Sequence, residues 1–141
     1  MASRRKGRIL AFQALYWWET SHVTVEELIK FSWLGEKQAA LEEGIAAFSR
    51  LMITGTVENI KSVDSIIKKH LDNWDISRLK KVDLAIMRIS VYSLMFQPDI
   101  SPSIIIDEAI GISKEFGADD SFRFINGVLD SIRKSLEADK K

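Results

Sequence analysis

The chain of 141 residues carries 20 basic and 20 acidic side chains, so its formal net charge is zero, and 46% of its residues are hydrophobic. This composition is typical of a globular protein and excludes a disordered one. The zero net charge excludes long-range attraction of the whole molecule to nucleic acid, so any such binding requires a local patch. The absence of cysteine excludes disulfides, thiolate metal sites and a cysteine nucleophile. The length fits one domain, residues 1–141.

A basic segment opens the chain, with Arg4, Arg5, Lys6 and Arg8 preceding the helical pattern of residues 11–19. It has no small-residue cleavage site, so we expect a cytoplasmic protein without a secretion signal. Cations at a helix amino terminus oppose the helix dipole by about 0.3–1 kcal/mol each, so they suit an external anion better than the helix. Residues 1–8 are therefore interpreted either as a phosphate-binding arm or as a solubilising tail.

Two further helices are predicted before residue 72. Thr24 and Glu27 have the spacing of a capping box, which starts a helix expected to end at Gly35. Apolar residues recur at intervals of three and four from 37 to 71, which predicts one long helix. Gly44 and Gly55 lie within it and each costs about 1 kcal/mol against alanine, so one of them is expected at a kink or a close helix crossing. A break near Gly55 is the alternative.

Residues 84–96 place apolar side chains on every helical face, which predicts a helix covered on all sides. The segment is shorter than the roughly 20 apolar residues of a membrane span, and Arg88 lies near its middle, so no membrane partner is expected. Arg88 must reach either an acidic partner inside the protein or the surface. We interpret this helix as the buried axis of the fold.

Turn and cap residues divide the rest of the chain. Asp72, Asn73 and Asp75 are turn or cap formers, and Ser101 with Pro102 is expected to start a helix that ends at Gly117. Asp119 and Asp120 are expected to open the last helix, whose apolar side ends before a solvated tail at 137–141. No useful alternating pattern of a strand is found. The sequence predicts an all-α, single-domain bundle of six or seven helices around the buried central helix.

No residue pattern indicates catalysis, a cofactor or a metal site. His22 and His70 lack a second ligand at suitable spacing and are expected at the surface. Adjacent carboxylates, such as Asp107 and Glu108, point about 100° apart on a helix and do not form an acid–base pair. We therefore do not expect an enzyme.

A specific pattern lies in IDEAIGISKEFGADDSFRFINGVLD, residues 106–130. It resembles the signature of the NusB family of bacterial transcription antitermination factors. The matching residues are Glu108, Ala109, Lys114, Phe116, Gly117, Phe124, Asn126, Gly127, Val128 and Leu129. Residues 11–19 are similar to the family's first helix, and residues 87–92 are similar to its central helix. The resemblance covers essentially the whole chain. It departs from the family at Asp107, usually asparagine, and at Lys6, usually arginine.

The resemblance implies a protein that binds boxA-type leader RNA of ribosomal RNA operons together with the ribosomal protein NusE, within the RNA polymerase antitermination complex. The RNA-binding candidates that it implies are Arg4, Arg5, Lys6, Arg8, Gln13, Tyr16, Asp120, Arg123 and Phe124. The candidates for binding the protein partner are Asp83 and Arg88, although an internal ion pair of Arg88 is an equal alternative. Asn126 and Gly127 are interpreted as a site of close helix packing.

Two other functions remain open. The same domain occurs fused to ribosomal-RNA cytosine methyltransferases, but this length and the lack of a methyl-donor glycine motif disfavour an enzyme. The second alternative is a helical protein–protein interaction module, or a homodimer, that does not bind RNA directly.

Overall fold

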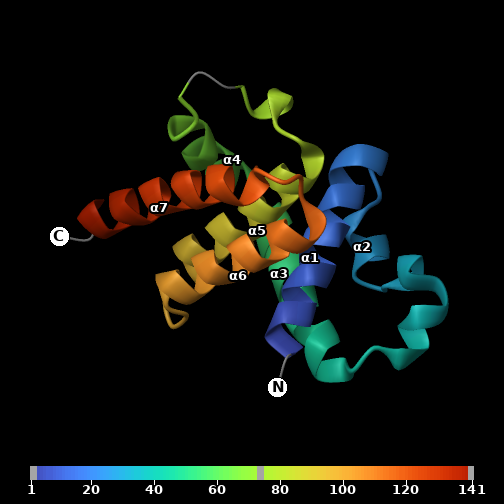
Figure 1. The fold of residues 1–141 in the computed structure, drawn as a ribbon. Coiled ribbons are helices and arrows are strands. Elements are labelled where there is room, and N and C mark those ends of the chain that lie inside the picture. The colour runs from blue at the N-terminus through green and yellow to red at the C-terminus, as the bar shows by residue number, and fades with distance from the viewer. Residues whose placement is uncertain (1–2, 73–74, 140–141) are drawn as a thin grey trace.

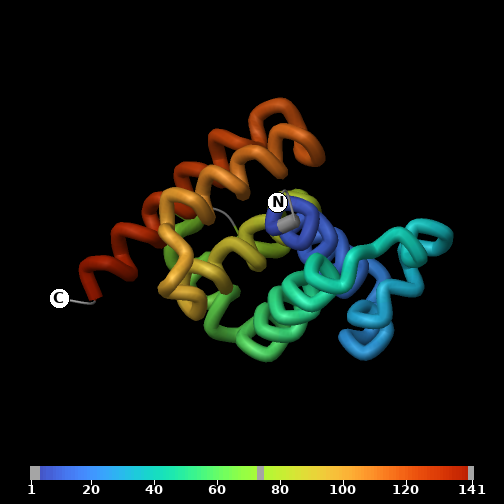
Figure 2. Tube along the Cα trace, turned by 90° about the horizontal axis from the view of Figure 1, so that it is seen from below, coloured from blue at the N-terminus to red at the C-terminus, as the bar shows by residue number. Residues whose placement is uncertain are grey.

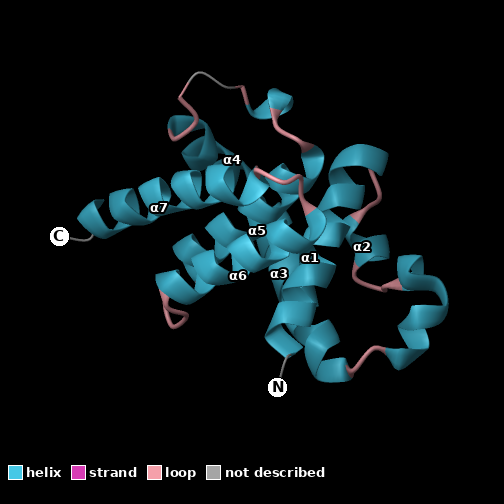
Figure 3. Ribbon diagram, in the orientation of Figure 1, coloured by secondary structure: helices cyan, strands magenta, loops and turns pink. Residues whose placement is uncertain are grey.

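The computed structural model describes residues 3–72 and 75–139. Within these ranges every regular element is helical, which confirms the predicted all-α fold (Figure 3). The elements are α1 (Ser3–Ser21), α2 (Val25–Leu28), η1 (Ser32–Ala40), α3 (Glu43–Glu58), α4 (Ile60–Lys69), η2 (Ile76–Arg78), α5 (Lys81–Phe96), α6 (Pro102–Phe116) and α7 (Ser121–Asp139). Of these, η1 and η2 are 3₁₀ segments. No helix among the described residues is long and apolar enough to span a membrane.

Helix α5 forms the axis of the fold, as its all-round apolar pattern predicted. It packs against α1, α3, α4, α6 and α7 and lies between them in Figure 1. Every residue from Asp83 to Ser93 is buried, whereas Phe96 in the last turn is 43% exposed. Burial on all sides is the state that this composition favours, because each buried aliphatic side chain contributes about 1.5–3 kcal/mol relative to exposure.

Two helix pairs flank this axis. Helix α1 packs along α3 on one side, and α6 packs along α7 on the other, as Figure 2 shows from below. Both pairs contribute to one hydrophobic cluster, in which Leu15, Met52, Ile112 and Leu129 are each no more than 1% exposed. The pair α1 and α3 and the pair α6 and α7 thus pack on opposite sides of α5.

Arg88 forms an internal ion-pair network, which is one of the two alternatives left by the sequence. Its guanidinium donates to Asp64 of α4 at 2.9 and 2.8 Å and to Glu19 of α1 at 2.7 Å. The ring of Trp18 lies 5.6 Å from the guanidinium carbon. Arg88 is only 6% exposed and its charge is neutralised within the chain, so the geometry supports the internal ion pair rather than a contact with a partner protein.

The helix that begins after Thr24 is much shorter than predicted. The Thr24 hydroxyl accepts from the backbone N–H of Glu27 as expected, but α2 ends at Leu28 instead of continuing to Gly35. Phe31 adopts a left-handed backbone (φ 59°) that brings its side chain into the core at 1% exposure. Burial of this large ring outweighs the local helical pattern, since a bulky residue rarely adopts positive φ without such compensation.

The predicted long helix of residues 37–71 is also divided. Residues up to Ala40 belong to η1, and α3 and α4 are separated by Asn59. The carbonyl of Gly55 accepts both the backbone N–H of Asn59 at 3.1 Å and its side-chain amide at 2.8 Å, a local side-chain bond of the kind that makes asparagine unfavourable within a helix. The alternative of a break near Gly55 is thus confirmed, and the break lies at Asn59, four residues after this glycine.

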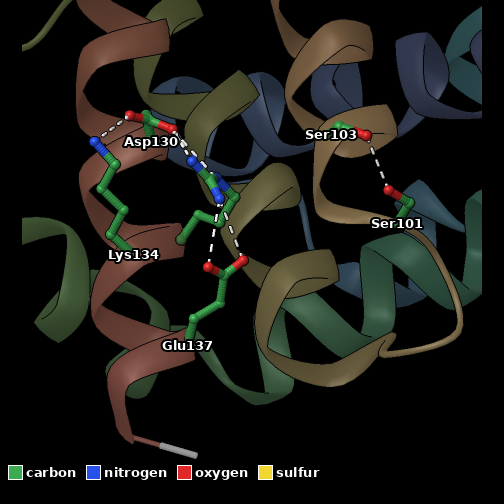
Figure 4. Close-up of polar contacts among 6 residues, drawn as sticks. Ser101, Ser103, Asp130, Lys134 and Glu137 are labelled. Atoms are coloured by element: carbon green, nitrogen blue, oxygen red, sulfur yellow. Dashed lines mark hydrogen bonds and ion pairs between the residues drawn. The ribbon is translucent and has the colours of Figure 1, made fainter.

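The carboxyl-terminal elements follow their cap signals closely. Pro102 is the first residue of α6, Gly117 follows its last, and Asp119 and Asp120 form the turn before α7. Residues 137–139 are exposed as expected, but they continue α7 as helix. In its last turns Asp130 pairs with Arg133 and Lys134, and Arg133 also pairs with Glu137 (Figure 4).

Gly127 does not mark close helix packing. A Cβ atom placed on it would meet no other atom within 4 Å, and the residue is exposed on α7. The interpretation of residues 126 and 127 as a packing site is therefore wrong.

Candidate nucleic-acid interface

The basic residues near the amino terminus belong to the first turns of α1 and do not form a separate arm. Ser3 to Arg8 are helical, while residues 1 and 2 lie outside the described part of the chain. Arg4 and Lys6 are exposed, and the Arg4 guanidinium carbon lies 5.8 Å from the centre of the Phe48 ring. Arg4 and Lys6 are thus the cations of this segment that are best placed to meet an external anion.

Arg5 and Arg8 instead converge on Glu108 of α6. Arg5 donates to both carboxylate oxygens at 2.9 and 2.7 Å, and Arg8 approaches one of them at 3.6 Å. The hydrogen bond from Arg5 holds the pKa of Glu108 below its usual value, whereas burial lowers the pKa of Arg8. Arg8 is 4% exposed and its guanidinium lies beneath the surface, so this geometry gives no support to the predicted RNA contact of Arg8.

Two grooves run along α1 and share Gln13, Leu34 and Lys37. The first, here called the aromatic groove, has a volume of about 390 Å³ and is lined by Phe12, Gln13, Tyr16, Trp17, Trp33, Leu34, Lys37, Val82 and Phe116. The second, here called the lysine groove, has a volume of about 630 Å³ and is lined by Lys6, Ile9, Leu10, Gln13, Leu34, Lys37, Ala40, Leu41, Glu42 and Ile45. Three predicted residues, Lys6, Gln13 and Tyr16, therefore lie on one continuous surface.

A pocket of about 190 Å³ lies between the loop before α5 and the start of α7. It is lined by Arg78, Leu79, Lys80, Asp83, Asp120, Ser121 and Phe124. It combines the predicted RNA residues Asp120 and Phe124 with Asp83, which was assigned to the protein partner. Asp83 is 6% exposed, and its buried Oδ1 has no hydrogen-bond partner among the described residues. Because Val82 of the aromatic groove precedes Asp83 on α5, the groove and the pocket are neighbours.

Arg123 lies in a fourth hollow, which is bordered by His70, Gly127 and Ser131. Its guanidinium carbon is 5.4 Å from the centre of the Phe122 ring, and Phe124 lines both this hollow and the neighbouring pocket. Arg123 is therefore adjacent to the predicted surface but does not line either groove of α1. Asp107, the departure from the family pattern, is exposed on α6.

Several residues of this surface were missed at the sequence level. Trp17 and Phe116 are 42% and 36% exposed, and Trp33 and Lys37 reach the grooves from η1. Trp17 and Trp18 are consecutive, and neighbouring residues of a helix point about 100° apart, so the pair itself signals that one indole faces outward. Trp33 and Lys37 had no comparable signal, because their segment was predicted to belong to regular helices.

The surface offers aromatic faces for stacking, cations for phosphates and amide or carboxylate groups for base edges. No group of three or more histidine, aspartate or glutamate side chains in residues 3–72 and 75–139 is placed to hold a metal ion. The fold and these grooves define an all-helical binding protein with an extended, open contact face. The NusB family model matches residues 5–134, and the chain belongs to the NusB family.

The relatives agree over nearly their whole length. The transcription antitermination protein NusB of Treponema denticola is 51% identical over 130 residues, which cover 92% of this chain and 95% of the relative. The NusB of Leptospira biflexa is 37% identical over 134 residues, covering 95% of this chain and 94% of the relative.

Solved structures show the same fold. NusB of T. maritima superposes with a TM-score of 0.83 at 32% identity, covering 93% of this chain and 90% of that one. A chain from a crystal structure of the antitermination factors NusB and NusE in complex with dsRNA gives a TM-score of 0.85 at 28% identity. That alignment covers 96% of this chain and 98% of the other.

Proposed function

We propose that this protein is a transcription antitermination factor that binds boxA-type leader RNA of ribosomal RNA operons jointly with NusE. It thereby supports processive transcription as part of the RNA polymerase antitermination complex, and it acts in the cytoplasm, where bacterial transcription takes place. The observation that carries the proposal is the continuous aromatic and cationic surface of α1, in a chain whose relative was solved with NusE and dsRNA.

The RNA contacts are proposed to come from two adjoining parts of this surface. Arg4, Lys6, Gln13 and Tyr16 contribute from α1, with cations for phosphates and polar or aromatic groups for bases. Arg5 serves chiefly to hold α1 against Glu108, and only its outer part is accessible, since its side chain is 39% exposed.

The second part is the pocket at the start of α7. Asp120 and Phe124 are proposed to contact RNA there, with Arg123 at its edge, and Asp83 is proposed to face NusE where RNA and protein meet. The proximity of Asp83 to Phe124 supports a shared site, because the partner and the RNA would then occupy adjacent positions.

Charge explains why a partner is needed. With 20 basic and 20 acidic side chains, the chain has no favourable overall field for RNA, and a few exposed cations neutralise only a few phosphates. A basic partner supplies more charge and more contact area. Because two proteins on one RNA reinforce each other, RNA must strengthen the protein pair by the same factor by which the partner strengthens RNA binding.

Isothermal titration tests the proposal by measuring four affinities. These are the affinity of RNA for the chain alone and for the chain bound to NusE, and the affinity of NusE for the chain alone and for the chain bound to RNA. We expect weak binding of boxA-type RNA to the chain alone and much tighter, sequence-selective binding when NusE is present. A scrambled RNA of equal length and composition is the control. Equal RNA affinity with and without NusE would contradict the shared site, and absence of RNA binding in both arms would favour a protein interaction module or a homodimer.

A further inference from the structure

The aromatic groove has a composition that RNA phosphate contacts alone do not explain. The rings of Tyr16 and Trp17 meet edge to face at a centroid distance of 5.7 Å, and those of Phe12 and Phe116 lie 5.2 Å apart. These two ring pairs and the indole of Trp33 line the same hollow. Trp17 and Phe116 nevertheless remain 42% and 36% exposed, so a large aromatic surface is open to a ligand.

The wall formed by η1 is held in place before any ligand binds. The Trp33 Nε1–H donates to the carbonyl of Leu28 at 2.9 Å, and the Gln38 amide donates to the carbonyl of Lys30 at 2.8 Å. Phe31 is buried beside Trp33, with their ring centres 6.2 Å apart. A ligand that enters the groove therefore meets a largely ordered surface, which lowers the entropy lost on binding.

Polar and charged groups at the groove favour a nucleotide over an apolar peptide side chain. Gln13 presents both donors and an acceptor, and Lys37 supplies a cation at the same hollow. Gln13 and Lys37 also line the lysine groove, which leads to Lys6. A base in the aromatic groove would thus leave its phosphate near Lys37 and direct the RNA backbone towards Lys6.

We propose that the aromatic groove binds one unpaired base of the RNA, stacked on the exposed ring of Trp17, with Lys37 of η1 contacting the adjoining phosphate. This inference rests on the proposed function and deepens it, because it assigns a base-binding role to η1 and to Trp17. The volume of about 390 Å³ lies within the usual range of small-ligand sites, roughly 300–1,000 Å³. Stacking requires no particular base, so the groove contributes affinity and register more than sequence selection.

The experiment measures binding of boxA-type RNA in the presence of NusE for Trp17→Ser, Trp17→Leu and Lys37→Gln. Loss of one stacked base is expected to weaken binding about 5- to 100-fold in both Trp17 variants. Lys37→Gln is expected to weaken binding several-fold. It should also reduce the salt slope, which is the slope of the logarithm of the binding constant against the logarithm of the salt concentration, by about one. The matched controls are Leu51→Ser, an exposed apolar residue of α3, and Lys69→Gln, an exposed cation of α4. Both controls should bind like the unchanged protein.

An RNA series identifies the base. Each nucleotide in turn is replaced by an abasic site, and affinity is measured with the unchanged protein and with Trp17→Leu. One abasic position should weaken binding to the unchanged protein and have little further effect on Trp17→Leu, because the same stacking contact is already lost. Additive losses at every position would overturn the inference. Melting curves of each variant show that the fold is retained.

The outcomes separate this inference from the function on which it rests. If the unchanged protein binds RNA with NusE and the Trp17 and Lys37 variants bind equally well, the base-binding groove is refuted and the proposed function stands. If the variants lose affinity for NusE in the absence of RNA, the groove is a protein-binding site and the inference is also refuted. If the unchanged protein binds no RNA with or without NusE, the proposed function itself fails.

Discussion

Gly55 of α3 lies directly against the aromatic ring of Tyr92 of α5. A Cβ atom at position 55 would overlap the ring carbons and the hydroxyl oxygen of Tyr92. The helices therefore approach each other at a point where only glycine fits, which confirms at Gly55 the prediction that one of Gly44 and Gly55 marks a kink or a close helix crossing. The helical penalty of glycine, about 1 kcal/mol against alanine, is offset by this contact between α3 and the central helix.

Gly55→Ala is expected to destabilise the protein by about 1–3 kcal/mol, because the added methyl group forces α3 and α5 apart or displaces Tyr92. Urea denaturation measures the loss. The matched control is Gly127→Ala, where open space surrounds the new Cβ and better helix propensity should raise stability by up to about 1 kcal/mol. Equal stability of the two variants would contradict the close crossing.

Arg88→Ala is expected to lower the free energy of unfolding by about 1–3 kcal/mol, because the partly exposed Asp64 and Glu19 lose the shared cation to which they are hydrogen-bonded. Arg133→Ala removes an arginine that also pairs with two acids, but on exposed α7 (Figure 4). Water screens those pairs, so the loss should be much smaller. Thermal and urea unfolding of both variants provide the comparison.

Arg88→Ala also tests whether Arg88 acts only through ion pairs within the chain or also contacts NusE. Below its unfolding transition the variant should bind NusE as the unchanged protein does. A selective loss of NusE affinity in a fully folded variant would instead restore Arg88 as a partner contact.

Glu108→Gln should destabilise the protein at neutral pH by about 1–3 kcal/mol, because Arg5 and Arg8 lose their carboxylate. The pKa of Glu108 is held below its ordinary value of 4.5 by Arg5, so its contribution is fully present above that pH. The contribution is lost as pH falls through the lower folded pKa. The stability difference between Glu108→Gln and the unchanged protein should therefore shrink in acid, as denaturation at a series of pH values will show.

Asp107→Asn is the control for this pH dependence. It removes a neighbouring carboxylate that is exposed on the same helix and restores the asparagine typical of the family pattern. We expect a change within about 0.5 kcal/mol. A pH profile of Glu108→Gln parallel to that of the unchanged protein would mean that the ion pairs with Arg5 and Arg8 do not stabilise the fold.

Arg4→Ala and Lys6→Ala should weaken binding of all RNAs alike and reduce the salt slope by about one each, because both residues are exposed and are proposed to meet phosphates. Lys134→Ala on α7 removes an exposed cation from the opposite end of the chain and should leave the slope unchanged. Titrations at several salt concentrations measure the effect. An unchanged slope for Arg4→Ala and Lys6→Ala would remove them from the interface.

Local signals in the sequence determined the helical class and many helix ends. The all-round apolar pattern of residues 84–96 predicted the buried axis, and Thr24, Ser101 and Gly117 marked helix boundaries that the structure has. These features depend on side chains within a few residues of one another, because helical periodicity and capping are short-range effects. The NusB signature in residues 106–130 also lies in one continuous segment.

Tertiary structure decided which side chains remain available for function. Arg5 and Glu108 are 103 positions apart, and Arg88 and Glu19 are 69 apart, so no local pattern could pair them. Burial of Phe31 likewise ended α2 early and turned the following segment into η1, which brought Trp33 and Lys37 to α1. The grooves exist only because these segments pack together, since the energy of burying large side chains across the fold exceeds local helix preference.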